Sequence, residues 1–576
     1  MCRLSQLMCN GRSADSTINS CNGFDCAAFL ERSGQNGRVL VDHPGALTEL
    51  WSPWYQQWSD GGSAQAAYDG GDAEHARKHV YIAARWFARG GSHLNWYMWH
   101  GGNNYVRGAG ASTAPWYYVG AQLSPDGLRN EPFASHTAAL YAALSVIAPE
   151  LLAHPAQANA QQPVPFLPSA GAGAWVFTDQ RYAFVYGGVA FIENAGRDVG
   201  TVRFRGREYA SAPESILIVD GSGELLFDTS AVSGSDVPTR SWTPVDEKPF
   251  LWTAWSESQS AGRPGVISSS LTVGTCVEDV CPMEQLRLTQ DDTEHALYTT
   301  RIDGAVVKRI LDDAGSMETV PLVVTSARAT ALCASIVDAG NASISSCSCA
   351  YDVTEDAGPV ALAIAVPTAE LRRGLASSGG GTVLLSLASE SLGVHKLSTI
   401  TNGPAPHAFT TTAVKGISGS VLLGGVDITR NGWTSTSGLA GEVAPPVWTA
   451  AGSARVAWAP TQGVSPPATW LRTTFAAPQA VVDAAAITAS LHLDASGLSR
   501  GHFYVNDWEV SRFWATRFCG EALCQRYYHV PPDVLVAGEN NLTIYDAEGA
   551  RNLDAVRMVL SRPDPRDVTA PKGISR

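Results

Sequence analysis

The spacing of hydrophobic positions in the first hundred residues predicts a strand, a helix and a second strand. The helix is expected between Asp72 and Arg89, because apolar side chains recur there at helical intervals and a glycine pair follows. A short apolar run that ends at Leu47 and a longer one over residues 94–99 predict the two strands. Because parallel sheets build their sites at the carboxyl ends of their strands, Glu49, just after the first run, is a candidate functional residue.

Further along the chain the pattern changes to short alternating segments between Gly-rich turns. An Ala- and Leu-rich helix is expected over residues 135–152, and strands are expected at 189–194, 201–209 and 215–220. The pattern therefore predicts an α/β region followed by all-β domains. The expected boundaries are 1–153 for the α/β region, 154–174 for a linker, 175–235 for a small β domain, 236–445 and 446–562 for two further β domains, and 563–576 for a polar tail.

Composition narrows the classes of partner. With 576 residues the chain is too long for one core, and its net charge of −14 argues against nucleic acid or an anionic membrane as a partner. No run of eighteen apolar residues occurs in the sequence, so no membrane span is expected. A net charge of −14 is compatible with a soluble protein that binds an uncharged ligand. Most of the seventeen tryptophans are expected to pack in cores.

Eleven cysteines are present, an odd number, and their spacing does not fix how they pair. No histidines lie beside them at zinc-ligand spacing, which favours disulfides in an oxidising compartment over a metal. Two glycosylation sequons, at Asn341 and Asn541, agree with such a compartment. Met1 to Gln6 contains no hydrophobic targeting segment. The close pairs are Cys21 with Cys26, Cys276 with Cys281, Cys347 with Cys349, and Cys519 with Cys524.

Three segments resemble a known family. Residues 47–55, LTELWSPWY, resemble the W-T-E-A-W-[ST]-G-W-F segment of family 35 glycoside hydrolases, the β-galactosidases, and above all its plant-type branch. Residues 95–105, NWYMWHGGNNY, resemble that family's N-Y-Y-M-Y-H-G-G-T-N-F, and residues 18–26, INSCNGFDC, resemble its I-N-T-C-N-G-F-Y-C. The resemblance implies that Glu49 is the catalytic nucleophile of a retaining glycosidase, which uses two carboxyl groups and no cofactor.

The resemblance also implies a fold. Residues 1–153 would be the C-terminal portion of a (β/α)8 TIM barrel, because residues 7–9 resemble a segment from the middle of the family's barrel. The later domains would be a small β domain and jelly-roll, galactose-binding-like sandwiches; residues 501–514 and 525–531 resemble the last of these. The family's acid/base glutamate belongs to an E-N-E-Y-type motif that this sequence does not contain. An incomplete chain and a true loss both remain open, and the chain alone is expected to be inactive.

Further site residues follow from the resemblance. Tyr97 matches a family tyrosine near the sugar, and Trp51 is a candidate wall of the sugar subsite. Val119 falls where the family carries a sugar-contacting tyrosine, so Tyr117 or Tyr118 is expected to replace it. Disulfides Cys21–Cys26 and Cys519–Cys524 are implied, as is a secreted, cell-wall, vacuolar or lysosomal location. No metal ligand is expected.

Other polar residues near these motifs are expected to have structural roles. Asp25, Asp42 and Asp60 are candidates for the second carboxyl only by proximity, and solvated loop positions are favoured for them. Asn103 and Asn104 are expected to shape a turn with Gly101–Gly102, and His100 is expected to be a structural histidine with its hydrogen bonds satisfied rather than a catalytic one. In the last domain, Asn506, Arg512 and Trp514 are expected to form a turn and an inter-sheet contact rather than a sugar site.

Three functions remain open from the sequence. The first is a retaining β-galactosidase that releases terminal β-linked galactose from an oligosaccharide or polysaccharide. The second is a non-catalytic carbohydrate-binding or scaffold protein. The third is an exoglycosidase for another β-linked sugar, suggested by Val119.

Overall fold

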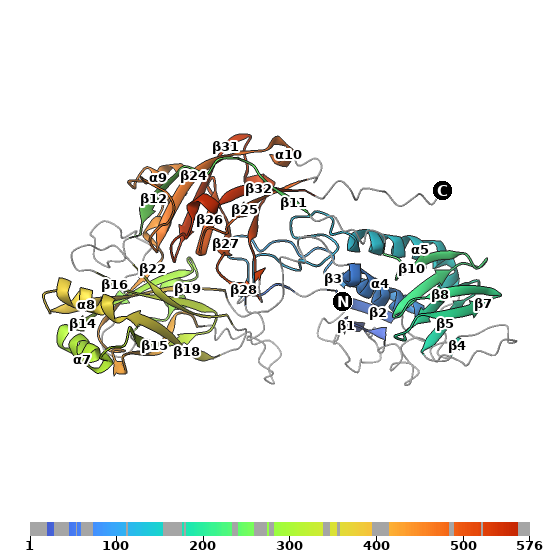
Figure 1. Ribbon diagram of the computed structural model, residues 1–576, viewed down its shortest axis with the longest axis horizontal. Helices are drawn as coiled ribbons and strands as arrows, with labels where there is room; N and C mark the ends of the chain where they lie inside the picture. Colours follow the sequence, from blue (N-terminus) through green and yellow to red (C-terminus); the bar gives the residue numbers. More distant parts are fainter. Residues whose placement is uncertain are drawn as a thin grey trace.

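The structure is a computed structural model. It describes residues 20–27, 45–52, 55–58, 73–110, 113–153, 175–177, 180–232, 240–257, 274–275, 282–337, 346–353, 358–393, 414–482, 489–519 and 522–562. The described parts form two lobes (Figure 1), with residues up to 232 in one lobe and residues from 240 onward in the other. The loops that precede the long helix of the first lobe lie at the junction, where Val106 forms a β-bridge to Ser511.

The first lobe begins with a three-stranded parallel sheet. Strands β1 (Ser20–Gly23), β2 (Gly45–Trp51) and β3 (Gly91–Tyr97) lie side by side, and helix α4 (Ala73–Ala88) connects β2 to β3. The predicted strand–helix–strand unit is confirmed. The second strand starts at Gly91, three residues earlier than predicted, and only glycine fits there, because a Cβ atom at position 91 would lie 2.2 Å from the Trp86 indole nitrogen. The glycine lets the strand begin directly after the helix.

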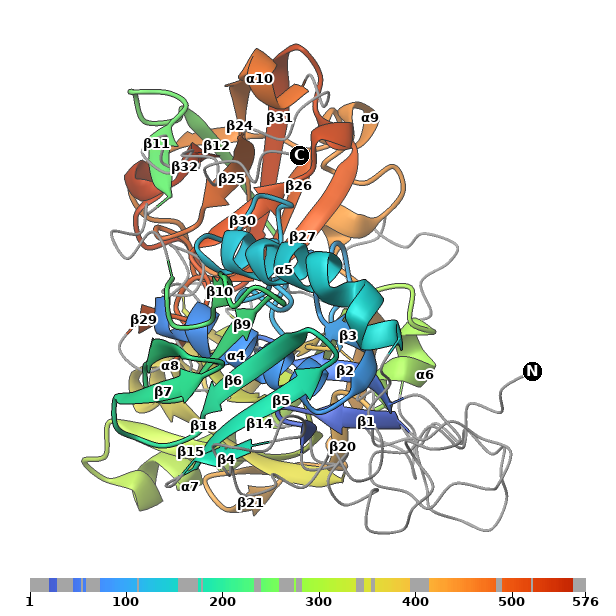
Figure 2. The same cartoon turned by 90° about the vertical axis from the view of Figure 1, so that its right-hand side faces the viewer.

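Helix α5 (Phe133–Ala153) confirms the predicted second helix. It packs against α4 and against strand β10 (Leu225–Asp228), as Figure 2 shows. Among the described residues it is the one helix that is long and apolar enough to cross a membrane by length and composition. However, Phe133, Leu140 and Ile147 are buried in a core that α5 shares with α4, the parallel sheet and the next domain.

The next unit is a five-stranded antiparallel sheet with a separate hairpin, β7 (Gly200–Phe204) and β8 (Arg207–Ser211). The prediction of one strand over residues 201–209 was wrong. Arg205 and Gly206 both have positive φ, 51° and 81°, so the chain reverses there and the segment forms two strands. The other strands, in spatial order, are β10, β9 (Ser215–Val219), β6 (Val189–Asn194), β5 (Arg181–Tyr186) and β4 (Trp175–Phe177).

Two sheets form the middle unit and enclose one apolar core. Helix α7 (Gly304–Ala314) covers it, capped by the Asp303 carboxylate, with Val307 and Ile310 turned inward. The six-stranded sheet has the order β13 (Gly274–Thr275), β22 (Trp433–Ser437), β14 (His295–Asp303), β19 (Thr382–Ser391), β16 (Thr330–Val337) and β17 (Ser348–Asp352). The four-stranded sheet has the order β18 (Pro359–Pro367), β15 (Thr319–Ala327), β20 (Ile417–Leu423) and β21 (Val426–Asp427), and helices α6 (Gln285–Thr289) and α8 (Thr368–Ser377) complete the unit.

The last unit also encloses one core between two sheets. Its six-stranded sheet has the order β23 (Ala459–Thr461), β12 (Trp252–Ser256), β24 (Thr469–Ala477), β31 (Gly538–Asp546), β26 (Arg500–Val505) and β27 (Trp508–Trp514). Its four-stranded sheet has the order β11 (Ser241–Pro244), β32 (Arg557–Arg562), β25 (Ser490–Asp494) and β30 (Tyr527–Val530). The short elements are hairpin β28 (Phe518–Cys519) and β29 (Ala522–Leu523), helices α9 (Ala450–Ser453) and α10 (Gln479–Val482), and 3₁₀ turns η3 (Ala440–Glu442), η4 (Pro532–Val534) and η5 (Leu553–Ala555).

Two strands of the last unit come from the range 236–445, which the sequence assigns to the middle sandwich. Strand β11 pairs with β32, and β12 pairs with β23 and β24. Trp252 explains the placement of β12, because its ring is buried in the last core and its indole N–H donates to the Leu553 carbonyl at 3.3 Å. The chain therefore enters the last unit, leaves it to build the middle one, and then returns.

A buried polar cluster joins the two lobes. Arg240 donates to Asp126 at 2.7 Å, and the hydroxyl of Ser490 donates to the same Asp126 oxygen at 2.5 Å. His492 lies 3.2 Å from that oxygen, and all four side chains are almost fully buried. Burial opposes the charge on Asp126, but Arg240 and His492 together hold its pKa well below the ordinary value. This fixed contact attaches the last sandwich directly beside the loops that follow β3.

Candidate functional site

Glu49 lies near the carboxyl end of β2, the middle strand of the parallel sheet. It pairs in register with Asn22 of β1, and two residues later Trp51 pairs with Tyr97 of β3. The flanking Leu47 and Leu50 are fully buried, whereas Glu49 is half-buried. The pairing of β2 with β3 is irregular between Leu47 and Leu50, so Glu49 lies in an interrupted part of the ladder near the carboxyl end of the strand, between two residues that anchor the strand in the core.

The Trp51 indole orients the Glu49 carboxylate. Its Nε1–H donates to Glu49 Oε2 at 3.0 Å, and its ring lies edge-on to Phe24, with ring centroids 5.2 Å apart. Phe24 is in turn held by the turn that the Cys21–Cys26 disulfide closes, with Cα atoms 6.0 Å apart. One carboxylate oxygen is therefore held by a charge-assisted hydrogen bond from a ring that is itself packed in place.

Four tyrosines gather beside this carboxylate. The hydroxyls of Tyr97 and Tyr117 lie 2.9 Å apart, and Tyr55 stacks on Tyr117 with ring centroids 5.5 Å apart and planes 9° from parallel. The ring of Tyr118 meets that of Tyr97 edge-on at 5.2 Å. Sequence reasoning named Tyr97, Tyr117 and Tyr118 but not Tyr55 as a site residue. The available signal was its position at the end of the Glu49 motif.

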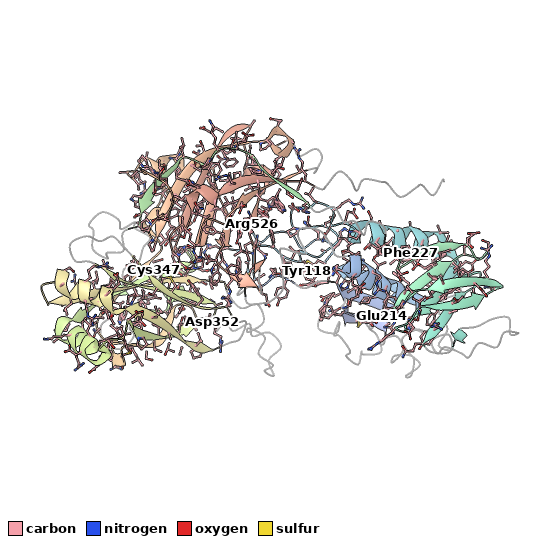
Figure 3. All side chains as sticks on the ribbon, in the orientation of Figure 1. Tyr118, Glu214, Phe227, Cys347, Asp352 and Arg526 are labelled. Carbon is pink, nitrogen blue, oxygen red and sulfur yellow. A yellow bond between two sulfur atoms is a disulfide. The ribbon has the colours of Figure 1, made fainter. Side chains whose placement is uncertain are left out.

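Tyr118 lies at the junction of the lobes (Figure 3) and is fully buried. Burial, and then the charges of Tyr97, Tyr117 and Glu49, raise the pKa of Tyr118 above its ordinary value, so its hydroxyl stays protonated. Within the described part of the chain, that hydroxyl has no hydrogen-bond partner. Val119 has a different environment, because it packs with Trp116, Tyr527 and Val559 of the last sandwich. Both predicted substitutes for the family tyrosine, Tyr117 and Tyr118, thus lie against Tyr97, whereas Val119 packs against the last sandwich.

The glycines after β3 permit this approach. A Cβ atom at Gly101 would lie 2.0 Å from the Tyr117 carbonyl oxygen and 2.5 Å from the Tyr118 Cβ. Gly102 has a φ of 72°, which suits glycine. The paired glycines therefore let the Tyr117–Tyr118 segment lie directly against the turn.

The neighbouring polar residues act in loops, as the sequence predicts. Asn103 donates to the Pro125 carbonyl at 2.9 Å, and Asn104 donates to the Ala114 carbonyl at 3.4 Å. His100 lies 3.4 Å from the Pro125 carbonyl oxygen. Asp25 pairs with Arg85 of α4 at 2.6 Å. Asp42 and Asp60 lie outside the described residues.

In the last sandwich, Asn506 and Trp514 have the predicted structural roles, but Arg512 differs. Asn506 forms the β26–β27 turn with a φ of 54°, and Trp514 is buried in the core. Arg512 instead donates to Glu294 of the middle unit, at 2.8 Å through Nε and with a second hydrogen bond through Nη2. The contact that Arg512 makes is therefore between units, not between the two sheets of one sandwich.

The disulfide predictions have a mixed outcome. Cys21–Cys26 is confirmed. Cys524 is disulfide-bonded, whereas the pairing of Cys519 with Cys524 stays a prediction. Cys347 is free, because Cys349 pairs with Cys333, which lies opposite it on the neighbouring strand. Cys276 and Cys281 lie outside the described residues.

Two clusters in the described part of the chain have metal-ligand geometry, and neither is a convincing metal site. Glu294, Glu390 and His502 lie together. Arg512 and Arg500 already pair with the two carboxylates. Burial disfavours protonation of His502, but hydrogen bonds to Glu390 and Glu509 outweigh it and raise its pKa to about 10, which removes its free lone pair. The other cluster is Cys333, Cys347 and Cys349, where a disulfide occupies two of the three sulfurs.

A carboxylate at the edge of a parallel sheet, held by an indole and bordered by aromatic rings, has the chemistry that a sugar-binding site requires. The comparisons with known proteins agree. Residues 2–141 match the model of glycosyl hydrolases family 35, and residues 468–540 match that of the β-galactosidase galactose-binding domain. Two segments of the chain are thus similar to two parts of family 35 β-galactosidases, one near its beginning and one in the last sandwich.

Similar whole proteins carry β-galactosidase names. "Beta-galactosidase 11" of Oryza sativa subsp. japonica is 27% identical over 97% of this chain and 58% of its own length. "Beta-galactosidase 11" of Arabidopsis thaliana is 26% identical over 94% of this chain and 56% of its own length. "Probable beta-galactosidase 2" of Dictyostelium discoideum is 23% identical over 91% of this chain and 62% of its own length. The chain thus spans less than two thirds of the length of these relatives.

Proposed function

We propose that this chain carries the nucleophile side of a retaining β-galactosidase site, with Glu49 as the nucleophile. The observation that carries the proposal is the hydrogen bond from the Trp51 indole to Glu49 Oε2 at 3.0 Å. It holds one carboxylate oxygen and leaves the other available for attack. The family match and the names of the relatives support a galactoside as the substrate.

The chemistry assigns a role to each group. Glu49 attacks the anomeric carbon and forms a glycosyl ester, while the aglycone oxygen leaves with a proton from a second carboxyl about 5 Å from the nucleophile. Water then cleaves the ester with retention of configuration. The hydroxyls of Tyr97 and Tyr117 donate to the sugar or to the carboxylate, and Trp51 forms one wall of the subsite. Tyr117 or Tyr118 takes the role of the family tyrosine whose position is occupied here by Val119.

The proposal includes a fold and a location. The three parallel strands and two helices would be the C-terminal portion of a (β/α)8 barrel, and the two-sheet units would be jelly-roll sandwiches of the galactose-binding type. A secreted or vacuolar location suits the two described disulfides, since such bonds persist in oxidising compartments. The substrate would be a galactose-bearing oligosaccharide or polysaccharide, and the acid/base glutamate would lie outside this sequence.

Covalent trapping tests the nucleophile without requiring the acid. A β-galactoside with fluorine in place of the hydroxyl beside the anomeric carbon, and with dinitrophenolate as leaving group, needs little protonation to react. The chain is incubated with this inactivator and then digested, and the peptide bearing Glu49 is expected to gain the mass of the fluorosugar. The Glu49→Gln variant should gain none. Glu131→Gln is the matched control, because Glu131 lies in the same lobe but pairs with Arg129.

Each alternative outcome has a definite meaning. If a different residue is labelled, the assignment of Glu49 is wrong. If the folded chain is not labelled at all, the non-catalytic carbohydrate-binding function is favoured. If the analogous β-glucoside labels Glu49 faster than the β-galactoside does, the function is that of an exoglycosidase for another sugar.

A further inference from the structure

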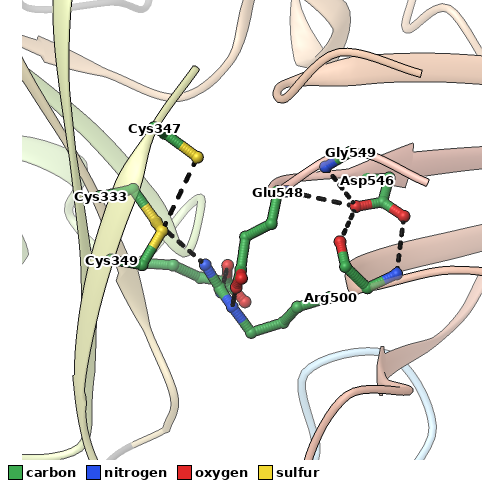
Figure 4. Close-up of a disulfide and its surroundings, with 9 residues drawn as sticks. Cys333, Cys347, Cys349, Arg500, Asp546, Glu548 and Gly549 are labelled. Carbon is green, nitrogen blue, oxygen red and sulfur yellow. Dashed lines mark hydrogen bonds and ion pairs between the residues drawn. A yellow bond between two sulfur atoms is a disulfide. The ribbon is translucent and has the colours of Figure 1, made fainter. Parts of the chain in front are cut away.

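Three sulfur atoms meet on the middle unit, far along the chain from Glu49. Cys333 of β16 and Cys349 of β17 are directly opposed, with Cα atoms 4.1 Å apart, and form a disulfide. Cys347 precedes β17, and its half-buried Sγ lies 3.8 Å from the Sγ of Cys349 (Figure 4). A free thiol is therefore in van der Waals contact with a sulfur of an existing disulfide.

The cluster faces the last sandwich, which supplies a cation. Arg500 of β26 donates through Nη2 to the Cys333 Sγ at 3.7 Å. The same guanidinium pairs with Glu390 of β19 and, at 2.8 Å, with Glu548, which follows β31 (Figure 4). Asp546, on β31, lies close by and accepts hydrogen bonds from Ser499, Glu548 and Gly549. The Arg500 guanidinium thus contacts Cys333, the disulfide sulfur that Cys347 does not contact.

We propose that Cys347, Cys349 and Cys333 form a thiol–disulfide exchange site that switches the pairing of Cys349. The Cys347 thiol loses its proton to solvent, and its thiolate attacks Cys349 Sγ. The Cys347–Cys349 bond forms as the Cys349–Cys333 bond breaks, and Cys333 leaves as a thiolate that later takes up a proton. No oxidant or reductant is consumed, because one disulfide replaces another.

Two observations set this direction of exchange. Cys349 is the sulfur in contact with Cys347, and a thiolate leaves faster when its negative charge is stabilised. The Arg500 Nη2–H supplies that stabilisation as a hydrogen bond to Cys333 Sγ, while the rest of the guanidinium pairs with Glu390 and Glu548. The exchange removes the covalent link between β16 and β17 and frees the Cys333 thiol at the contact between the middle and last sandwiches.

The surroundings also make the exchange slow at neutral pH. Burial, and then the negative charge of Glu548, raise the pKa of Cys347 to about 12, while Arg500 acts in the opposite direction. Only the thiolate attacks, and its fraction grows tenfold for each pH unit below the pKa. The rate of exchange should therefore be about 100 times higher at pH 9 than at pH 7.

Peptide mapping of the full chain tests the proposal. The oxidised protein is incubated at pH 7 and at pH 9, its free thiols are alkylated, and it is cleaved without reduction at arginine and aspartate. Asp338 lies between Cys333 and Cys347 in the sequence, so cleavage there separates them. Before incubation the Cys333 and Cys349 peptides should be linked, with the alkyl group on Cys347. After incubation at pH 9 the peptides should be unlinked, with the alkyl group on Cys333.

Two variants serve as controls. Cys347→Ser removes the attacking sulfur and should keep the link at both pH values. Cys347→Ser combined with Ser348→Cys moves the thiol by one residue, to the opposite face of the strand, and should also keep the link. The proposal is overturned if the wild type stays linked after incubation at pH 9. It is equally overturned if Cys347→Ser loses the link at the wild-type rate, because another nucleophile would then be responsible.

Discussion

The carboxylate of Glu49 and the carboxylate pair Glu294–Glu390 differ in burial and in the charges around them. Glu49 is half-buried, accepts an indole N–H at 3.0 Å and lies beside neutral tyrosines. Glu294 and Glu390 are buried at the contact between the middle and last sandwiches, where Arg512, Arg500 and His502 neutralise them. The half-exposed Glu49 carboxylate is open to a ligand. The Glu294 and Glu390 carboxylates already form ion pairs with Arg512 and Arg500 of the last sandwich. A strongly paired cluster is therefore the poorer candidate for chemistry.

The largest expected effect is the loss of labelling when Glu49 is replaced. Replacing Glu49 with Gln keeps the hydrogen bond from Trp51 but removes the nucleophile, so the rate of fluorosugar labelling should fall by at least about 10³-fold. The free energy of unfolding should stay within about 0.5 kcal/mol of the wild type, because the side chain is half-exposed. Mass spectrometry and urea unfolding measure the two quantities. A large loss of stability would mean that Glu49 is a structural residue.

Arg512→Met should give the reverse result. It leaves Glu294 buried without its partner, which should cost about 3–5 kcal/mol of unfolding free energy. Labelling at Glu49 should continue at 25 °C in the folded fraction. Arg373→Met is the matched control, since Arg373 pairs with Glu370 on the exposed face of one helix and should cost no more than about 0.5 kcal/mol. Equal losses in the two variants would contradict the role of the buried pair.

The raised pKa of the buried Glu442 carboxyl group should make the stability of the protein depend on pH. Burial raises its pKa to about 7, against hydrogen bonds from the Leu439 N–H and the Thr293 hydroxyl. Between about pH 4.5 and 7 the folded state holds a proton that the unfolded state has lost, so the contribution of Glu442 to stability falls as pH rises. The slope is at most about 1.4 kcal/mol per pH unit. Urea unfolding across this range should show a flatter profile for Glu442→Gln, and an unchanged profile would contradict the prediction.

Tyr118→Phe should have the smallest effect on stability. Its buried hydroxyl has no partner in the described part of the chain, so its removal should change the free energy of unfolding by less than about 0.5 kcal/mol. If that hydroxyl contacts the sugar, labelling should slow by about tenfold, because a hydrogen bond contributes about 1.4 kcal/mol. Val119→Ala, which alters a contact with the last sandwich, should leave the labelling rate unchanged. Equal labelling in Tyr118→Phe and the wild type would remove Tyr118 from the site.

The sequence by itself determined the local features of this protein. Helical spacing located α4, the turn residues located the loop after β3, and the short Cys21–Cys26 separation was compatible with the disulfide that forms. The motif selected Glu49 as a candidate, and its position near a strand end followed from the strand–helix–strand order. These features depend on residues close together in the chain, where periodicity and turn chemistry carry information.

Only the tertiary structure decided the remaining features, because they join residues far apart in the sequence. Trp252 draws β12 into the last sandwich, and Cys333 rather than Cys347 pairs with Cys349 because β16 lies opposite β17. The contact of Arg512 with Glu294 spans two units, and no local pattern marks it. Likewise, Tyr118 and Val119 are neighbours in the chain, yet one meets Tyr97 and the other meets the last sandwich. Local sequence limits which side chains are available, but packing between distant segments fixes the environment that gives each one its role.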